Sequence, residues 1–362
     1  MLKVLYILNH AGKAGTERYV ESLIEKLNNK RIKAYFVYNE DGLLVEKLRV
    51  IGVETLQIKM RSPFDIIAAL KLNFFCRKMG IDIIHAQFLR ENYISLFSKI
   101  FNPKIKIIYT NHFILKNNII LRITNRLLNP LLKSVISVCN KGKEMLISNG
   151  VKEQKISVIF NGVDVFTWRE PTKSTLRSEY NIGDEVFVIL CASRFAYDKG
   201  HEFLINGIAN LKKITKRKFK CILANDGPFL EERKKQVNNL KLNDNIIFTG
   251  FRKDIKNLIY GSDLYVNSSI HEALSFAIIE VLACGLPVIA TDMAGNSDII
   301  NNETACGILV QYNDITGLSN AINKVMEDQK LQQTLKENSL KTVEERFNLD
   351  KIIDRTYEIY NT

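Results

Sequence analysis

The chain has 362 residues, of which 46% are hydrophobic and 25% are charged, and its formal net charge is +12. This composition is typical of a folded globular protein and excludes a disordered or low-complexity chain. Because one hydrophobic core rarely keeps growing at this length, we expect two domains of about 150 to 200 residues.

The chain carries no sign of export or of a membrane span. Its start, "MLKVLYILNHAG", predicts a β-strand and lacks the order of a signal peptide. No run of about 18 uncharged apolar residues is present. Six cysteines lie far apart without a C-x-x-C pair, which is typical of a reduced protein. We therefore expect a cytoplasmic protein.

The first half alternates short apolar runs with amphipathic stretches. Short runs rich in Val and Ile, separated by helical patterns, predict βαβ units in a parallel sheet covered on both faces. In chain order, strands are predicted at 3–9, 33–39, 81–87, 104–112, 132–140 and 155–164, and helices at 15–30, 63–80, 92–101 and 142–150.

The second half repeats this α/β alternation. Strands are predicted at 186–194, 219–226, 245–250, 263–269, 287–292 and 306–310, with helical stretches between and after them. The intervening segment has no sustained period and contains Pro171, which favours a linker. We expect an α/β fold of two doubly wound, Rossmann-like domains: 1–165, a linker at 166–185, and 186–344, with a C-terminal helix at about 345–362 packing back on the first domain.

Ligands of open parallel sheets bind beyond the carboxyl ends of the strands. Gly12 and Gly15 lie there, after the first strand and before a helix that we expect to start near Thr16. Glycines at a helix N-terminus let a backbone approach a phosphate closely. The spacing is not a dinucleotide fingerprint, and such glycines often serve only the turn.

Two cations follow the first strand of the second half. Arg194 and Lys199 leave one strand end five residues apart, before a predicted helix. Arg as a fork and Lys as a point charge can bind a pyrophosphate together. As isolated residues they would be ordinary surface charges, and their shared position favours the binding role.

The stretch "SSIHEALSFAIIEVLACGLPVIATD" carries two acids eight residues apart. Glu272 follows a predicted strand, and Glu280 lies within a helix that Ser275 should cap and Gly285 should end. Carboxylates can accept hydrogen bonds from neighbouring hydroxyls of a sugar or ribose, and helix N–H groups between them would attract phosphate. The alternative is a helix whose outer, polar face meets solvent.

The chain resembles the retaining GT-B glycosyltransferases of the group 1 or family 4 type. "HEALSFAIIEVLACGLPVIATD" is similar to the E-x7-E signature of that family, and "SRFAYDKG" to its R-x4-K-G element. Further similarity lies in "FNGVD", "NDGP", "FTGF" and the N-terminal "G-x-x-G-T-E". The matches keep the family order from residue 9 to about residue 300. They imply two domains facing across a cleft and sugar transfer from a nucleotide-diphosphate donor.

The resemblance also implies roles for single residues. Glu280 would hold the ribose hydroxyls, Glu272 the hydroxyls of the transferred sugar, and Arg194 and Lys199 the diphosphate. His112 matches the family's T-x-H histidine, which reaches toward the donor sugar, although such a histidine is more often structural. The implied catalytic residues are His112, Arg194, Lys199 and Glu272, and the donor-binding residues are Gly12, Gly15, Arg194, Lys199, Ala273, Leu274, Ser275, Phe276 and Glu280.

Three positions depart from the family pattern. Ala273 and Ser275 stand where many members have glycine, and Ala14 replaces one glycine of the usual N-terminal pair. The loops are therefore bulkier. No D-x-D motif precedes an apolar strand end, so we expect no metal and no other cofactor, with UDP or GDP as the donor nucleotide. A GT-B sugar-nucleotide epimerase or a phosphorylase is the alternative.

The positive charge is concentrated in the first half. Residues 1–165 contain 26 Lys and Arg against 13 Asp and Glu, whereas residues 166–362 contain 25 against 26. Such asymmetry indicates an anionic partner. A nucleic acid is disfavoured because no RNA- or DNA-binding motif is present. We expect a glycan or lipid-diphosphate acceptor in surface polysaccharide assembly, with peripheral attachment to an anionic membrane through 115–134; the alternative is a buried helix with a solvated basic edge.

Overall fold

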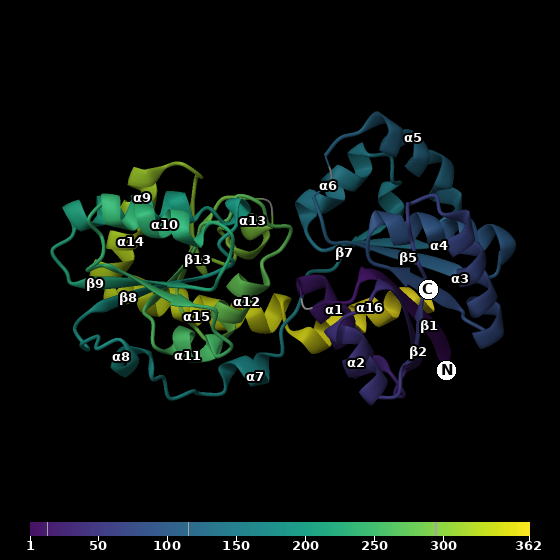
Figure 1. The fold of residues 1–362 in the computed structure, drawn as a ribbon, viewed down its shortest axis with the longest axis horizontal. Helices are drawn as coiled ribbons and strands as arrows, with labels where there is room; N and C mark the ends of the chain where they lie inside the picture. Colours follow the sequence, from purple (N-terminus) through teal and green to yellow (C-terminus); the bar gives the residue numbers. More distant parts are fainter. Residues whose placement is uncertain (13, 115, 294) are drawn as a thin grey trace. The chain divides into compact units, whose positions relative to one another are not determined.

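The computed structural model describes residues 1–12, 14–114, 116–293 and 295–362. The chain divides into two compact units, each built around its own parallel sheet (Figure 1). The first unit comprises Met1–Asn161 and Asp350–Thr362, and the second comprises Gly162–Leu349. The predicted α/β class with two doubly wound sheets is confirmed.

In the first unit the strands follow the order β3-β2-β1-β4-β5-β6-β7, and every pair is parallel. The order reverses beside β1, which is where an open sheet of this kind binds ligands. The strands are β1 (Leu2–His10), β2 (Ile32–Glu40), β3 (Glu54–Gln57), β4 (Ile83–Ala86), β5 (Lys106–Asn111), β6 (Ser134–Ser137) and β7 (Ile156–Val158).

Helices cover both faces of this sheet (Figure 1). They are α1 (Gly15–Leu27), α2 (Leu43–Val50), α3 (Ile66–Met79), α4 (Leu89–Phe101), α5 (Ile119–Leu128), α6 (Asn140–Ser148) and α16 (Leu349–Asn361). Neither α2 nor β3 is among the predicted elements, because both are short and three of the four residues of β3 are polar. The expected membrane-contacting stretch contains α5, and its first residue, Leu115, lies outside the described residues.

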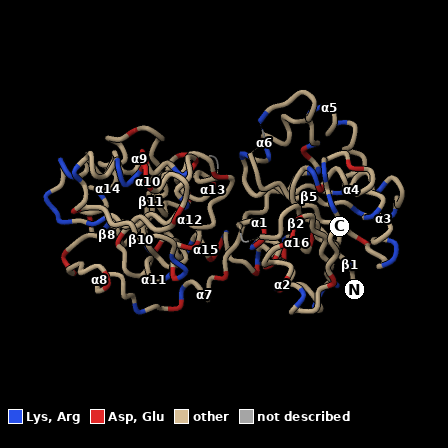
Figure 2. Tube along the Cα trace, in the orientation of Figure 1, with Lys and Arg blue, Asp and Glu red and all other residues tan. Residues whose placement is uncertain are grey.

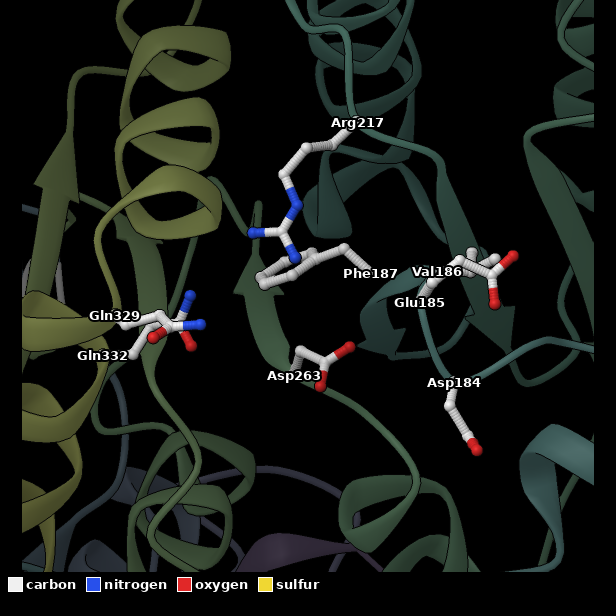
Figure 3. A pocket seen from close by; sticks show the side chains of 8 residues that line it. All are labelled: Asp184, Glu185, Val186, Phe187, Arg217, Asp263, Gln329 and Gln332. Atoms are coloured by element: carbon white, nitrogen blue, oxygen red, sulfur yellow. The ribbon is translucent and has the colours of Figure 1, made fainter.

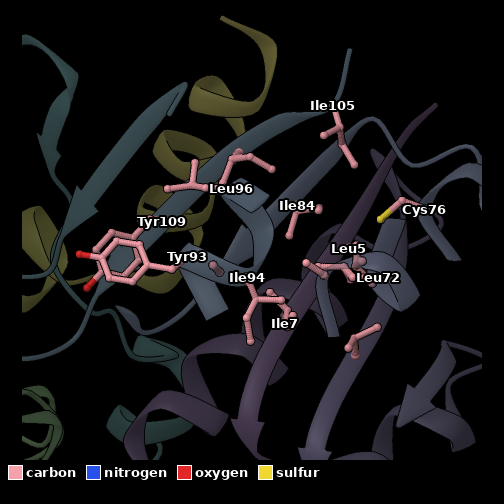
Figure 4. Packing of buried hydrophobic residues seen from close by; sticks show 14 of the residues in the cluster. Leu5, Ile7, Leu72, Cys76, Ile84, Tyr93, Ile94, Leu96, Ile105 and Tyr109 are labelled. Carbon is pink, nitrogen blue, oxygen red and sulfur yellow. The ribbon is translucent and has the colours of Figure 1, made fainter. Parts of the chain in front are cut away.

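The core on one face of this sheet joins strand side chains to α3 and α4. Leu5, Ile84 and Tyr109 of the strands pack in one cluster with Leu72 of α3 and Ile94 of α4 (Figure 4). All five are buried. Because side chains on a strand alternate between the two faces of a sheet, the nearly continuous apolar runs of β1, β4 and β5 require helices on both sides.

The C-terminal helix α16 packs on the first unit. The Tyr360 hydroxyl is fully buried and lies 2.7 Å from Nδ1 of His85 in β4 and 3.2 Å from the hydroxyl of Tyr6 in β1. Nε2 of His85 lies 2.6 Å from the hydroxyl of Thr110 in β5. A buried chain of hydrogen bonds therefore joins α16 to three strands.

In the second unit the order is β10-β9-β8-β11-β12-β13, again with parallel pairs only. The strands are β8 (Phe187–Ala192), β9 (Phe219–Ala224), β10 (Ile246–Gly250), β11 (Leu264–Asn267), β12 (Val288–Thr291) and β13 (Gly307–Val310). The helices are α9 (His201–Ile214), α10 (Leu230–Asn239), α11 (Ile255–Tyr260), α12 (Phe276–Ala283), α13 (Asn296–Ile299), α14 (Ile315–Glu327) and α15 (Gln329–Arg346).

The segment 166–185, expected to be a linker, is part of the second unit. It contains α8 (Leu176–Glu179), and α7 (Val165–Arg169) overlaps its start. Leu176 is fully buried, and the Ser174 hydroxyl donates to the Asn257 carbonyl at 2.8 Å. A Pro-containing polar sequence without a regular period is thus held by hydrogen bonds to a distant part of the second unit. Within the described residues, no helix combines the length and apolar character that crossing a bilayer requires.

Candidate active site

The predicted cations and the first predicted carboxylate follow two neighbouring strands of the second sheet. β8 and β11 are parallel partners, so the loops that follow them leave the same edge of the sheet. The loop after β8 contains Arg194 and Lys199, and the loop after β11 contains Glu272. The structure therefore places these residues at the carboxyl edge, where ligands of such sheets bind.

Lys199 and Glu272 form an ion pair there. Nζ of Lys199 donates to Oε1 of Glu272 at 2.7 Å, and it lies 3.3 Å from Oδ2 of Asp198. The side chains of Lys199 and Glu272 are 21% and 19% exposed, so water screens the pair only partly. Burial alone would lower the pKa of Lys199, but the carboxylates of Glu272 and Asp198 raise it. The ammonium is thus charged at neutral pH.

Backbone contacts hold the two loops together. The Ser268 hydroxyl donates to the Lys199 carbonyl at 2.9 Å, and the Ile270 N–H donates to the Asp198 carbonyl at 2.8 Å. Gly200 has a φ of +63°, and a Cβ at this position would lie 2.0 Å from the Ser268 carbonyl oxygen. Only glycine fits this approach, which explains why the lysine is followed by a glycine.

The loop after β11 leads directly into α12, as predicted. Ser275 caps the helix: its hydroxyl accepts from the Ile278 N–H at 3.4 Å and from the Asn267 side chain at 3.4 Å. Gly285 follows the helix with a φ of +74°, the backbone conformation that favours glycine. The predicted N-cap and helix end are confirmed. Ala273, Leu274, Ser275 and Phe276 therefore form the approach to a helix N-terminus and its first residue.

Glu280 lies inside α12 and is 7% exposed. The alternative of a solvent-facing polar helix surface is therefore wrong for this residue. The Tyr265 hydroxyl, in the neighbouring strand β11, is also buried. Burial is the main reason that the pKa of Tyr265 is raised, and Cys191 and the carboxylates of Glu272 and Glu280 add to it. The phenol of Tyr265 is therefore neutral at physiological pH.

Arg194 is exposed on the loop after β8. Within the part of the chain that the structure describes, its guanidinium makes no hydrogen bond or ion pair. The loop itself is well supported: the Phe195 N–H donates to the Asp226 carbonyl at 2.9 Å, and a Cβ at Gly227 would lie 2.5 Å from the Phe195 carbonyl oxygen. The "NDGP" turn after β9 therefore supports the backbone that carries Arg194.

His112 follows β5 in the first unit and is held by Gln87. Nε2 of His112 lies 2.9 Å from Oε1 of Gln87, and the Gln87 amide donates to the His85 carbonyl at 3.3 Å. This second bond turns the amide oxygen toward His112, so Nε2 carries the hydrogen and Nδ1 is the acceptor nitrogen. Burial lowers the pKa of His112 to about 3, which keeps the ring neutral. Gln87 was not predicted; its place after β4 is the signal that marks it.

Gly12 and Gly15 lie in the loop between β1 and α1. The helix begins at Gly15, one residue before the predicted start, and Ala14 provides no side-chain cap. A Cβ at Gly12 would lie 2.6 Å from Nε2 of His10, so a side chain there would displace that histidine. These residues and His112 belong to the first unit, whereas Arg194, Lys199, Glu272 and Glu280 belong to the second.

A cavity of about 90 Å³ lies elsewhere in the second unit, beside the amino ends of β8 and β11 (Figure 3). Arg217, Phe187 and Asp263 line it, and the Arg217 guanidinium lies 5.5 Å from the centre of the Phe187 ring. Asp263 also pairs with Arg177 at 2.8 Å. These charges are already engaged, and the cavity is at the sheet edge opposite the predicted site. Among the described residues, no group of three or more His, Cys, Asp or Glu is placed to hold a metal ion.

Comparisons with known proteins match both units. The family described as "Glycosyl transferases group 1" matches residues 172–342, and "Glycosyltransferase Family 4" matches residues 14–165. N-acetyl-alpha-D-glucosaminyl L-malate synthase of Bacillus anthracis is 24% identical over 86% of this chain and 82% of its own length. A Campylobacter jejuni enzyme, N-acetylgalactosamine-N,N'-diacetylbacillosaminyl-diphospho-undecaprenol 4-alpha-N-acetylgalactosaminyltransferase, is 24% identical over 97% of both chains.

A solved structure shares the fold over nearly the whole chain. Anabaena Alr3699/HepE in complex with UDP has a TM-score of 0.89 and 22% identity, and the match covers 99% of this chain and 100% of that one. At this identity the likeness establishes the fold, which is GT-B.

Proposed function

Because the chain belongs to the glycosyltransferases of group 1 and family 4, we propose that it transfers a sugar from a nucleotide-diphosphate donor to a glycan or lipid-linked acceptor with retention of anomeric configuration. One observation carries the proposal most directly: Lys199 and Glu272, from two different loops, meet at 2.7 Å at the carboxyl edge of the second sheet. A cation for a phosphate and an acceptor for sugar hydroxyls stand there side by side.

In the proposed donor complex, the diphosphate binds near the N-terminus of α12. Lys199 neutralises it as a point charge, and the exposed guanidinium of Arg194 offers a fork for phosphate oxygens. Glu280 accepts from the ribose hydroxyls, and Glu272 accepts from the hydroxyls of the sugar. The ion pair with Lys199 orients Glu272 before the donor arrives, which lowers the entropy cost of binding.

In the transfer step, the bond between the anomeric carbon and the β-phosphate oxygen breaks, and a bond from the acceptor oxygen to the anomeric carbon forms. The acceptor proton passes to the departing phosphate on the same face of the sugar, which gives retention without an enzymatic nucleophile. Lys199 and Arg194 stabilise the negative charge that grows on the leaving diphosphate. Glu272 binds the sugar in this scheme, and trapping a covalent glycosyl adduct on Glu272 would contradict it.

His112 has the role of a neutral hydrogen-bonding group in this scheme. Since Nε2 donates to Gln87, Nδ1 accepts a hydrogen bond from a sugar hydroxyl. No divalent metal is proposed, because the two cations and the helix dipole provide the positive potential that a leaving diphosphate needs.

We propose UDP or GDP as the donor nucleotide and a lipid-diphosphate or glycan acceptor in the assembly of capsule, lipopolysaccharide or exopolysaccharide at the cytoplasmic face of the cell membrane. The UDP bound to Anabaena HepE supports a uridine nucleotide as the donor. The diphospho-undecaprenol in the name of the Campylobacter enzyme supports a lipid-diphosphate acceptor.

The decisive experiment incubates the full chain with UDP-, GDP- and ADP-sugars and lipid-linked acceptors, and measures nucleoside diphosphate release and the anomeric configuration of the product. We expect one donor class to be used without added metal and to raise the melting temperature. Arg194→Ala should lower kcat about 100-fold, because one donor to the leaving charge is lost; Lys216→Gln, an exposed change of equal charge, should not. Interconversion of nucleotide sugars without an acceptor would instead establish an epimerase.

A further inference from the structure

The short helix α5 of the first unit turns its apolar face outward. Ile119, Ile120, Ile123 and Leu127 are between 53% and 73% exposed. At helical spacing these four side chains share one side of α5. A helix on a folded domain ordinarily shows the reverse pattern, with its apolar side packed inward. The alternative of a buried helix with a solvated edge is therefore wrong for α5.

The inward side of α5 is held largely by hydrogen bonds. Asn125 is 4% exposed; its amide donates to the Asn149 carbonyl at 2.8 Å, and its oxygen accepts from the Tyr93 hydroxyl at 2.8 Å. The Asn118 N–H donates to the Asn149 side chain at 3.0 Å. Rotating the helix to hide its isoleucines would break these buried bonds, each of which costs about 1–3 kcal/mol to leave unmade. The outward apolar face is thus built into the fold.

Basic residues flank this face. Arg122 and Arg126 are exposed on α5, one and two turns into the helix. They belong to a longer basic segment, because residues 92–143 contain nine Lys and Arg and no Asp or Glu. Figure 2 shows blue segments around α5 and α6. Apolar side chains beside basic ones, in a segment without acids, are complementary to a partner that is both apolar and anionic.

Helix α3 repeats the pattern on the same face of the sheet. Its Ala68 and Leu72 pack in the cluster that Leu121 and Leu128 of α5 also contact, so both helices expose their other sides away from that face. The ring of Phe64 lies 5.7 Å from that of Tyr93, the residue that donates to α5. The exposed apolar residues of this α3–α5 surface are Phe64, Ile66, Ile67, Leu70, Phe74, Ile119, Ile120, Ile123 and Leu127.

We propose that the α3–α5 surface docks on an anionic lipid bilayer, with α5 lying in the plane of the interface. A helix face that only contacts water would not be expected to carry four exposed branched apolar side chains. A second copy of this chain would bring the same positive charge of Arg122 and Arg126 to the contact, and repulsion between like charges disfavours it. The docking deepens the proposed function, since it would present the first unit to a lipid-linked acceptor, but it requires neither donor nor turnover.

The test is flotation of the full chain with vesicles of phosphatidylglycerol and phosphatidylcholine, or of phosphatidylcholine alone, at low and high salt. We expect binding to the anionic vesicles at low salt and weaker binding at high salt. Arg122→Gln with Arg126→Gln should weaken it about 30-fold, at about 1 kcal/mol or fivefold per charge. Ile120→Ser with Leu127→Ser should weaken it about 10- to 100-fold. The matched control, Lys216→Gln with Lys235→Gln, removes the same charge from exposed sites of the second unit and should change nothing.

Equal absence of binding to both kinds of vesicle would overturn the proposal, as would equal losses in the α5 variants and the control. The proposal would also be overturned if vesicles did not bind and the chain formed a dimer that dissociates when Ile120 and Leu127 are replaced. A second copy of the chain would then cover the surface. Hydrolysis of the donor by the same variants, measured without lipid, is a separate readout. If it persists while flotation is lost, docking and the proposed transfer are distinguished.

Discussion

Replacing Lys199 by methionine removes the ammonium that lies 2.7 Å from Oε1 of Glu272. Breaking a fully buried ion pair costs about 3–5 kcal/mol, and a surface pair contributes at most about 1 kcal/mol. With both side chains about one-fifth exposed, we expect a loss of about 2 kcal/mol. For a unit of this size that is a melting-temperature decrease of about 4 to 8 °C. The catalytic effect should be separate and larger: a decrease in kcat of about 100- to 1000-fold, because charge on the leaving phosphate is greatest in the transition state.

The assay compares Lys199→Met, Glu272→Gln and the double variant by thermal melting and by kcat and KM for the donor. Neutralising both partners removes the unpaired charge, so the double variant should regain most of the stability. It should not regain turnover. If the double variant recovered turnover together with stability, the pair would be structural, and our assignment of Lys199 to the leaving group would be wrong.

The other predictions concern three different positions. Glu280→Ala should weaken donor binding by about 1.5–3 kcal/mol in calorimetry, because ribose hydroxyls lose an ionised acceptor; unchanged affinity in a protein that melts much earlier would make the residue structural. A Cβ at Gly295 would lie 1.6 Å from the Ala273 carbonyl oxygen, so Gly295→Ala should displace the Glu272 loop and raise the donor Kd at least about tenfold; unchanged affinity would refute this. Burial, helped by His112, lowers the pKa of His85 to about 3 from 6.5. The unfolded chain therefore takes up the proton first, and His85 alone should lower the free energy of unfolding by about 2 kcal/mol from pH 6.5 to 5 in urea unfolding. His85→Gln should remove this part of the pH dependence and leave the part that His112 contributes.

The helix at the second acid was predictable because its signals are local. Ser275 and Gly285 bracket an apolar run, and each acts on backbone groups within a few residues of itself. The placement of Arg194, Lys199 and Glu272 at one edge was also predictable, since residues after parallel strands share that edge. These signals did not predict the ion pair between Lys199 and Glu272, because it depends on the pairing of β8 with β11, which is a long-range contact.

Contacts between distant segments explain what the sequence did not predict. Gln87 orients His112 from another strand, and Tyr360 reaches His85 from 275 residues away. The place of Gln87 after β4 indicates that it lies at the carboxyl edge but not which residue it contacts, and nothing near Tyr360 in the sequence indicates its contact with His85. The segment 166–185 was predicted to be a linker for a related reason. Its buried apolar residues, Leu176 and Ile182, lie six residues apart in a polar sequence, and two such residues define no periodicity.

The charge asymmetry illustrates how structure sharpens a composition argument. The first 165 residues have an excess of 13 positive charges, of which the segment 92–143 alone supplies nine. The remainder of that half holds 17 Lys and Arg against 13 Asp and Glu, which is close to balance. A basic surface kept only for solubility has no reason to concentrate its charge in the one segment whose helix α5 turns isoleucines to the outside. Since charge and exposed apolar area coincide in α5, a partner that is both anionic and apolar accounts for the two features together, and an anionic bilayer is such a partner.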